Sequence, residues 1–339
     1  VAPAELTLPP GSYLLTLKVE GSREVRYPLL LERGERRIAS VALPVEGGIP
    51  PGFVFIPGGP FLFGSGDEDA VRQFFSTVPI HQVETGPYLI AEDETTYAEW
   101  IEFLEALPPG ERRRHAPHPS TSVILGAVRL LPTNPAASGK HGWILEMQPS
   151  GSGAPHRARE DEPITFSGRA TRKSQSWLRL PVAGISFDDA QAYARWLDDS
   201  GRVPGARLCT EREWERAARG ADARSYPHGD RLAPDDANFD RTYGKDPNGF
   251  GPDEVGSHPA SKSPFGVNDL TGNVWEWTTT SFGPPGAVLR GGGYYYDAGT
   301  DHADNRFLAE PTLRDPVVGL RICAPAPMQP SPQPPGSPP

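Results

Sequence analysis

The chain of 339 residues is long enough to bury a large core and to hold one big domain plus a small one. Its formal net charge of -10 at pH 7 argues against a nucleic-acid backbone as partner, because phosphates repel an acidic surface. It contains 40 prolines and 37 glycines, and only 37% of its residues are hydrophobic, which is typical of a loop-rich fold rather than a helical bundle. No run of apolar residues approaches the roughly 20 that are needed to cross a bilayer.

The start of the chain and its cysteines indicate its context. The first residue is Val1, without an initiating Met or a signal peptide, so we expect the cut edge of a longer polypeptide. The two cysteines, Cys209 and Cys323, are too few for a disulfide scaffold or a thiolate metal cluster. Either they pair with each other, or both are buried as free thiols.

Residues 1–48 predict a small all-β module. Alternating runs at 13–19, 25–31 and 38–43, separated by short turns, predict three strands. This stretch resembles a PEGA-type β-module, a repeat common beside bacterial surface and signalling domains. Residues 47–52 are glycine and proline apart from one isoleucine, and they form the predicted linker to the next domain.

The following stretch predicts short strands and one helix. Strands are predicted at 53–59 and 61–64, punctuated by glycine, and at 83–90. Thr96 and Glu99 form a capping box, which predicts that a helix begins there. The prolines and glycine at 108–110 are predicted to end this helix. Its buried face is formed by Tyr97, Trp100, Ile101 and Leu104.

Residues 110–178 are interpreted as an insertion without identifiable chemistry. The arginines and histidine at 112–115 lie among prolines, which predicts a solvated loop. Residues 123–131 and 143–147 predict the two strands of a hairpin joined across 134–141.

The second half begins with regular elements and then becomes irregular. Residues 181–185 predict a strand, and the residues at 186–189 and 210–213 cap two core helices, the second of which ends at Gly220. Turns dominate from 226 to 266. The tail from Pro325 onward, with 327–339 as its own segment, predicts a disordered or polyproline linker.

Residues 266–277 carry the strongest local pattern. Asp269 and Glu276 are hard oxygen donors, and Gly272 between them allows a tight turn. In such a turn the carbonyls of Gly272 and Val274 could point the same way as the two carboxylates, which would place four oxygens around a calcium ion. The alternative is that Glu276 caps backbone amides in a buried turn.

Six segments, taken in order, resemble the formylglycine-generating enzyme, or sulfatase-modifying-factor, domain family. The resemblance spans about residues 50–324, within a predicted domain at 49–326, and implies an α+β fold that is a C-type-lectin-like variant with much irregular structure. The segments are 53–59 (FVFIPGG), 182–190 (VAGISFDDA), 207–215 (RLCTEREWE), 271–277 (TGNVWEW), 289–293 (LRGGG) and 318–321 (VGLR).

Within this family, the chain looks most like domains that follow a serine/threonine kinase in bacteria. Residues 207–211, 226–230 and 310–315, leading to 319–323, carry this likeness. It implies that the partner is the kinase domain of the same longer polypeptide. It also implies a bond between Cys209 and Cys323, which a cytosolic setting, the favoured location, would keep reduced.

The resemblance implies two calcium ions. The first maps onto Asp269, Glu276 and the carbonyls of Gly272 and Val274, all of which are present. The second maps onto Asn238, Phe239, Asn248 and Phe250, with Asp246 as an alternative donor. Asn248 replaces a charged ligand by a neutral one, and the loss of a formal charge weakens a calcium site.

The resemblance also bears on catalysis. The oxidase members convert a substrate cysteine to formylglycine with two thiolates that hold copper(I), a soft metal suited to sulfur. The two cysteine positions fall at about Tyr296 and Asp301, neither of which replaces a thiolate. We therefore do not expect copper oxidase activity.

Other chemistry finds little support in the sequence. A second enzymatic branch, the iron-dependent sulfoxide synthases, takes its histidines from a separate helical domain, whereas the eight histidines here are scattered. His228 and His302 lie in family-defined loops and are expected to form hydrogen bonds. Asp297, Asp301 and Asp304 could line an acidic cleft or a solvated loop.

The remaining hypothesis is binding. The family's substrate cleft maps onto Tyr294, Tyr295, Tyr296, Asp301, His302 and Asn305, and tyrosine favours recognition of a peptide or small molecule. The first hypothesis is a non-catalytic ligand- or protein-binding module attached to a signalling kinase. The alternatives are an enzyme with thiol-independent chemistry in the same cleft, and a diversified lectin-fold receptor.

Overall fold

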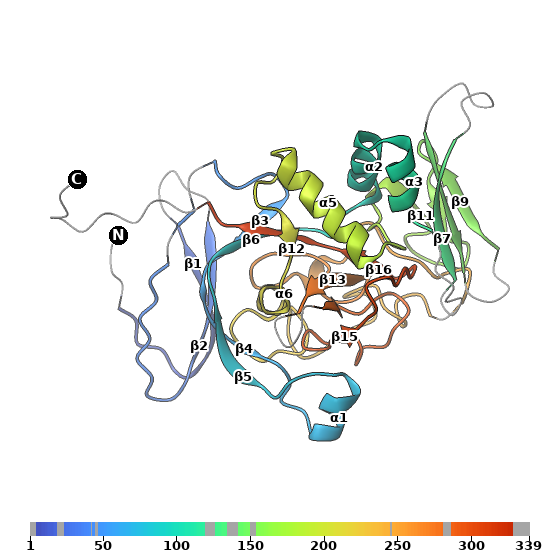
Figure 1. Ribbon diagram of the computed structural model, residues 1–339. Helices are drawn as coiled ribbons and strands as arrows, with labels where there is room; N and C mark the ends of the chain where they lie inside the picture. Colours follow the sequence, from blue (N-terminus) through green and yellow to red (C-terminus); the bar gives the residue numbers. More distant parts are fainter. Residues whose placement is uncertain are drawn as a thin grey trace, which may run out of the picture.

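The computed structural model describes residues 5–18, 24–41, 43–44, 47–118, 126–133, 142–149, 154–244, 246–280 and 286–327 (Figure 1). The strands are β1 (Gly11–Leu17), β2 (Val25–Leu31), β3 (Phe53–Ile56), β4 (Gly59–Phe63), β5 (His81–Thr85), β6 (Tyr88–Ala91), β7 (Ala127–Pro132), β8 (Trp143–Gln148), β9 (His156–Arg159), β10 (Ile164–Thr165), β11 (Ser174–Gln175), β12 (Arg207–Leu208), β13 (Trp275–Thr279), β14 (Ala287–Arg290), β15 (Phe307–Leu308), β16 (Val318–Leu320) and β17 (Ile322–Pro325). The helices are α1 (Asp69–Phe74), α2 (Tyr97–Ala106), α3 (Pro109–His115), α5 (Phe187–Asp199) and α6 (Glu211–Arg219), with 3-10 turns η1 (Trp177–Arg179) and η2 (Pro259–Ser261).

Two four-stranded sheets form the centre of the molecule. One has the order β12-β17-β6-β3 and is antiparallel. The other has the order β15-β14-β13-β16, in which only β13 and β16 run parallel. Because Arg321 is the single residue between β16 and β17, the chain passes from one sheet to the other at this residue.

Smaller sheets lie around this centre. The β1–β2 hairpin lies at one side of the view in Figure 1, and the β7-β8-β9 sheet lies at the opposite side, beyond α2 and α3. The core is rich in large side chains, and the indoles of Trp100, Trp177, Trp214 and Trp277 are fully buried. Along the part of the chain that the structure describes, no helix is both long and apolar enough to cross a bilayer.

The helix starts predicted from sequence are confirmed. Thr96, Ser186 and Thr210 each accept from the backbone amide three residues on, and each capping box is complete. Gly220 ends α6 at φ 78°, a conformation that costs little only for glycine. The predicted hairpin of the insertion is confirmed as the pair β7–β8, while its residues 123–125 and 134–141 lie outside the described part.

Several predicted strands differ from the structure. The described residues of 38–43 form no strand, because Val41 and Leu43 pack against the hydrophobic core instead of joining the β1–β2 pair. The predicted strand at 83–90 is two strands, β5 and β6, since Pro87 between them has no N–H to donate to a ladder. Residues 181–185 form one isolated bridge, from Pro181 to Thr96, rather than a strand.

The prediction of a solvated loop at 112–115 is wrong, because these residues lie in α3. Arg112 donates to the carbonyls of Leu104, Glu105 and Leu107 at the C-terminal end of α2, where carbonyls lack part of their intrahelical partners. His115 is buried, and its Nδ1 lies 2.8 Å from Asp189 Oδ1 in α5. At the other end, Pro325 closes β17, and residues 328–339 of the predicted tail lie outside the described part.

Candidate functional site

Glu276 lies in the middle of the second sheet, on β13 between β14 and β16. Its carboxylate is buried and accepts from Nε and Nη2 of Arg321 at 2.7–3.0 Å. Trp214 of α6 donates its indole N–H to Glu276 Oε2 at 2.6 Å. A buried charge needs partners of this kind, because an unpaired one costs several kcal/mol of desolvation.

Arg321 extends this contact to the first sheet. Its Nη1 donates to the carbonyls of Ala91 and Glu92 at 3.0–3.1 Å, and its Nη2 donates to the carbonyl of Asn268 at 3.0 Å. The guanidinium therefore satisfies backbone acceptors after β6 while it neutralises Glu276.

Two further carboxyl groups lie near this pair. Asp269 Oδ2 accepts from the amide of Gly256 at 2.6 Å, and burial raises the pKa of Asp269 to about 6. Glu94 accepts from Asn273 Nδ2 at 2.8 Å and from the amide of Val274, and burial raises the pKa of Glu94 well above its usual value. The turn from Asp269 to Asn273 has positive φ at Asp269, Gly272 and Asn273.

This geometry does not fit the first calcium ion that the resemblance implies. Both oxygens of Glu276 are engaged by a guanidinium and an indole, and Asp269 is engaged by the amide of Gly256. A calcium ion on Glu276 would face the positive charge of Arg321. Glu276 accepts from two side chains, whereas the alternative hypothesis had it cap backbone amides in a buried turn. Among the residues with described positions, no three His, Cys, Asp or Glu side chains are grouped as ligands for one metal ion.

The second set of candidate ion ligands is only partly engaged by other residues. Asn238 donates through Nδ2 to the carbonyl of Gly251 at 3.1 Å, while its buried Oδ1 has no partner. The side chain of Asn248 donates to Asp246 Oδ1 at 3.2 Å. Phe239 is buried, and the ring of Phe250 contacts Tyr295.

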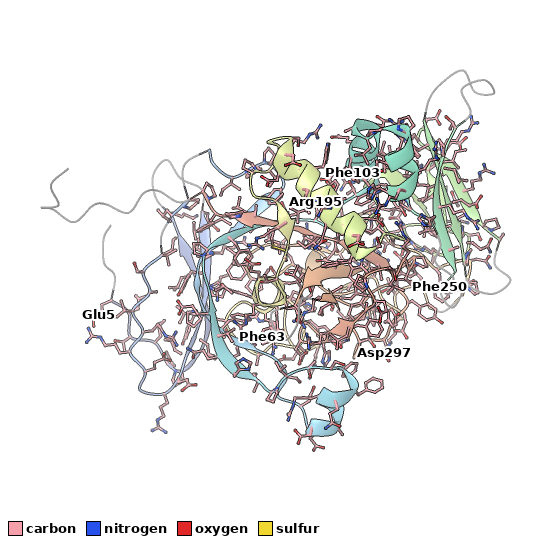
Figure 2. The ribbon with its side chains drawn as sticks, viewed as in Figure 1. Glu5, Phe63, Phe103, Arg195, Phe250 and Asp297 are labelled. Atoms are coloured by element: carbon pink, nitrogen blue, oxygen red, sulfur yellow. A yellow bond between two sulfur atoms is a disulfide. The ribbon has the colours of Figure 1, made fainter. Side chains whose placement is uncertain are left out.

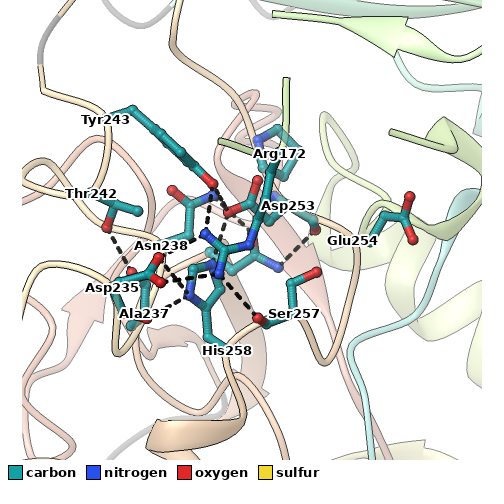
Figure 3. A network of polar contacts seen from close by, with 12 residues as sticks. Arg172, Asp235, Ala237, Asn238, Thr242, Tyr243, Asp253, Glu254, Ser257 and His258 are labelled. Carbon is teal, nitrogen blue, oxygen red and sulfur yellow. Dashed lines mark hydrogen bonds and ion pairs between the residues drawn. The ribbon is translucent and has the colours of Figure 1, made fainter. Parts of the chain in front are cut away.

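A polar network next to this set is centred on Asp253 (Figure 3). Asp253 Oδ1 accepts from Arg169 Nη1 at 2.6 Å, and Oδ2 accepts from Tyr243 and His258 at 2.8 Å each. Burial opposes ionisation of Asp253, but the hydrogen bond from His258 and the charge of Arg169 outweigh it and lower its pKa. His258 also reaches the carbonyl of Asp235 through Nδ1, and although burial acts against its charge, the bond to Asp253 raises its pKa.

The loop at 291–305 carries the positions of the family's cleft. Tyr294 is buried in the core and donates to the carbonyl of Pro316, and Asn305 is also buried. Asp301 is fully buried; its Oδ1 accepts from the amide of Gly293 at 3.0 Å, its Oδ2 has no partner, and burial raises its pKa well above the usual value. His302 packs edge-on against Tyr226, with ring centroids 5.0 Å apart.

Tyr295 and Tyr296 of this loop belong to a continuous row of aromatic rings, which we call the aromatic strip. Centroid separations along it are 5.2 Å, 5.8 Å, 5.7 Å and 6.3 Å, all within the range of favourable ring contacts. Phe307 is 53% exposed, and three of the other rings are half-buried. In Figure 2, Phe250 at one end of the strip and Asp297 of the 291–305 loop both lie at the lower right. The strip consists, in spatial order, of Phe250, Tyr295, Tyr296, Trp275 and Phe307.

The two cysteines lie outside this loop. Cys209, directly after β12, and Cys323 of β17 form a disulfide across the antiparallel pair of strands. Of the two alternatives for the cysteines, the structure has the pairing. No free thiol is left among the two cysteines of the chain.

The other candidate polar residues of the region form local contacts. His228 Nε2 lies 3.3 Å from Asp236, and His302 Nδ1 lies 3.9 Å from Asp304. Asp297 accepts from Thr300, as a residue at the start of a turn does. These contacts stabilise loops and do not bring an acid, a base and a nucleophile together.

Two cavities lie elsewhere on the molecule. One, of about 120 Å³, lies between β2 and β4 and is lined by residues that include Tyr27, Phe61 and Gln82. The other, of about 420 Å³, is open and lies beside Asp222 and His228. Neither of these two cavities is lined by residues of the aromatic strip.

Sequence reasoning missed the partners of the acidic residues. Glu94, Arg169, Asp253 and His258 are buried and central, yet none was selected. Asp253 and Arg169 are separated by 84 positions, so no local spacing connects them. The available signal was the placement of Arg169 between Gly168 and a mostly polar segment at 170–176, which alone does not predict burial.

The arrangement of two small sheets, few helices and long irregular segments defines a C-type-lectin-like α+β fold. Residues 42–326 match the sulfatase-modifying factor enzyme 1-like domain, and the chain belongs to this family.

Relatives in this family include active and inactive proteins. The chain is 30% identical over 248 residues to a formylglycine-generating enzyme of Mycobacterium tuberculosis, covering 68% of this chain and 74% of the relative. It is 40% identical over 121 residues to the inactive C-alpha-formylglycine-generating enzyme 2 of Mus musculus, covering 33% and 36%. It is 28% identical over 262 residues to a hercynine oxygenase of Mycolicibacterium smegmatis, covering 76% and 51%. Among solved structures, PvdO from Pseudomonas aeruginosa has a TM-score of 0.53 at 22% identity, covering 80% of this chain and 94% of PvdO, and shares the fold.

Proposed function

We propose that this chain is a non-catalytic binding module that recognises a peptide segment and belongs to a bacterial signalling serine/threonine kinase. The observation that carries the proposal is the aromatic strip, a partly exposed row of rings that includes Tyr296, one of the two positions onto which the resemblance maps the thiolates of the family's oxidases. The family includes proteins named as inactive, so loss of the reaction with retention of the fold has precedent.

The side chains at the two thiolate positions support loss of the oxidase reaction. The phenol of Tyr296 packs on Trp275, and burial raises the pKa of Tyr296 to about 12. Burial also raises the pKa of Asp301, which favours the neutral acid. A neutral phenol and a neutral carboxylic acid are poor ligands for copper(I), which prefers soft sulfur donors.

The surroundings of the strip favour a protein segment over a small molecule. Phe74 is 81% exposed and Leu308 is 59% exposed, so apolar area extends beyond the rings. Arg306 donates to the carbonyl of Ser76, which holds the segment after α1 next to β15. Exposed apolar area with aromatic side chains is typical of surfaces that bind proteins. The net charge of -10 favours basic residues beside the apolar ones in the ligand.

Selection from a displayed random peptide library against the immobilised chain tests this proposal. We expect peptides with apolar and basic residues, whose affinity falls at least tenfold in Tyr295→Ala and Phe307→Ala. Tyr13→Ala, on the remote β1 strand, is the matched control and is expected to leave the affinity unchanged. Equal affinity in all three variants, or failure to select any peptide, would refute a binding role for the strip.

The oxidase reaction needs its own measurement. A cysteine-containing peptide is incubated with the chain, copper and oxygen, and its mass is followed. We expect no formylglycine product, and turnover would restore an enzymatic function with thiol-independent chemistry.

The kinase association is tested on the natural polypeptide. An antibody against this chain recovers the protein from the cells that make it, and peptide mapping by mass spectrometry identifies its full extent. We expect peptides of a serine/threonine kinase domain in the same polypeptide, and a natural polypeptide without one would refute the association.

A further inference from the structure

We infer that the guanidinium of Arg169 provides the positive charge that holds the 246–253 loop, in place of the second calcium ion that the family resemblance implies. The residue belongs to the 110–178 insertion, to which the sequence assigned no chemistry.

Arg169 is bonded as a cation in a cage of oxygens. Its side chain is fully buried, and Nε donates to the carbonyl of Gly249 at 2.7 Å. Nη2 donates to the carbonyl of Gly251 at 2.6 Å, and Nη1 donates to Asp253 Oδ1 at 2.6 Å. Three backbone or carboxylate oxygens of one short loop therefore face one positive charge.

Aromatic rings complete the cage. The guanidinium carbon lies 3.8 Å from the centroid of Phe166 and 4.1 Å from that of Tyr243. Such contacts are favourable for a cation and more so when water is excluded. The planar shape of the guanidinium fits between two rings and also presents donors in its plane, whereas a spherical ion satisfies neither condition.

Glycine at position 168 allows the insertion to reach this loop. Its amide donates to the carbonyl of Asn248 at 3.1 Å. A Cβ at this position would lie 2.7 Å from Asp246 Oδ2 and 2.8 Å from the amide nitrogen of Gly249, which is closer than real Cβ contacts. The approach of the two backbones therefore requires Gly168, and it brings the next residue into the cage.

A calcium ion at the same place would compete with this arrangement. Calcium takes six to eight oxygen ligands at about 2.3–2.6 Å. The candidate ligand Asn238 donates to the same carbonyl of Gly251 that Arg169 binds, so an ion on Asn238 would lie beside the guanidinium and be repelled by it. The neutral Asn248 fits this assignment, because the buried negative charge of the loop is carried by Asp253 and is already paired, whereas Asp246 is exposed. Asn238 Oδ1 is a buried candidate atom without a hydrogen-bond partner, and the experiment must therefore count ions.

The first measurement is thermal unfolding of Arg169→Met, which removes the charge and keeps an unbranched apolar side chain. Loss of one partner of a buried pair is expected to lower Tm by about 10 °C or more. Arg172→Met is the matched control, since Arg172 lies three positions on and pairs with Asp235, which is 73% exposed. The decrease in Tm of Arg172→Met is expected to be a small fraction of the decrease in Arg169→Met. Equal losses in the two variants would overturn the inference.

The second measurement is native mass spectrometry with added calcium. It tests whether a calcium ion can occupy the site, and it does not require Arg169→Met to fold. Asn248→Asp restores the charged ligand of the family pattern while Arg169 remains in place. We expect this variant to bind the same number of calcium ions as the unmodified chain. One additional ion in Asn248→Asp, or an ion in the unmodified chain that Asn238→Ala removes, would show that Arg169 does not occupy the site.

Discussion

The disulfide between Cys209 and Cys323 leads to a quantitative prediction about stability. It closes a loop with a sequence separation of 114 between two strands of the first sheet. In the chain-entropy description, a loop of this length restricts the unfolded chain by about 5 kcal/mol at 25 °C. For a domain of this size, 1 kcal/mol corresponds to about 2–4 °C in Tm. Removal of the bond is therefore expected to lower Tm by about 10–20 °C.

The assay is thermal unfolding with and without dithiothreitol, on the natural sequence and on the double variant Cys209→Ala and Cys323→Ala. Both sulfurs are buried, so complete reduction is verified by mass after alkylation in denaturant. The variant controls for effects of the reductant, because its Tm should not respond to dithiothreitol. If the reduced natural sequence unfolds within 2 °C of the oxidised one, the entropic argument fails for this chain.

Two further predictions concern buried contacts. Asp189 caps α5 and accepts from His115; burial opposes its ionisation, but the bonds from His115 and Ser186 lower its pKa. Its stabilisation is therefore present above the usual carboxyl pKa of ~4 and is lost as pH falls through the lower folded value. Asp189→Asn should cost about 3 kcal/mol near pH 7, and urea unfolding from pH 7 to pH 3 should show this difference shrinking; a difference that grows in acid contradicts the assignment. Gly292→Ala should be about 2 kcal/mol more destabilising than Gly34→Ala, since both have φ near 75° but only at Gly292 would the Cβ overlap Asp301 Oδ1, 1.7 Å away. Equal losses in urea unfolding would show that the clash is relieved without cost.

Local signals allowed a large part of the fold to be predicted. The capping boxes at Thr96, Ser186 and Thr210 are complete within four residues, so the sequence determines where these helices begin. The run at 38–43 alternates as a strand does, but a strand also needs a partner edge, and that is decided by distant residues. The α3 helix at 109–115 was missed because its arginines are stabilised by carbonyls of the preceding helix, a contact that composition does not reveal.

In the candidate site too, local patterns could be predicted from the sequence and long-range contacts could not. Asp269 and Glu276 could be singled out from the sequence because they are only seven positions apart. Glu276 is paired with Arg321, which is 45 positions away, so no local pattern in the sequence predicts this contact. The aromatic strip likewise unites residues from four separate segments, so only its two tyrosines were predicted as part of a binding surface.

The position of Arg321 at the crossing from β16 to β17 has a consequence for how the molecule comes apart. One guanidinium is bonded to acceptors that belong to both layers, and the covalent cross-link lies two residues further along. Neither layer can open without breaking contacts of the other, so the centre should melt as one cooperative unit. Slow amide exchange should then extend across both layers at a common rate, while the peripheral hairpins exchange faster.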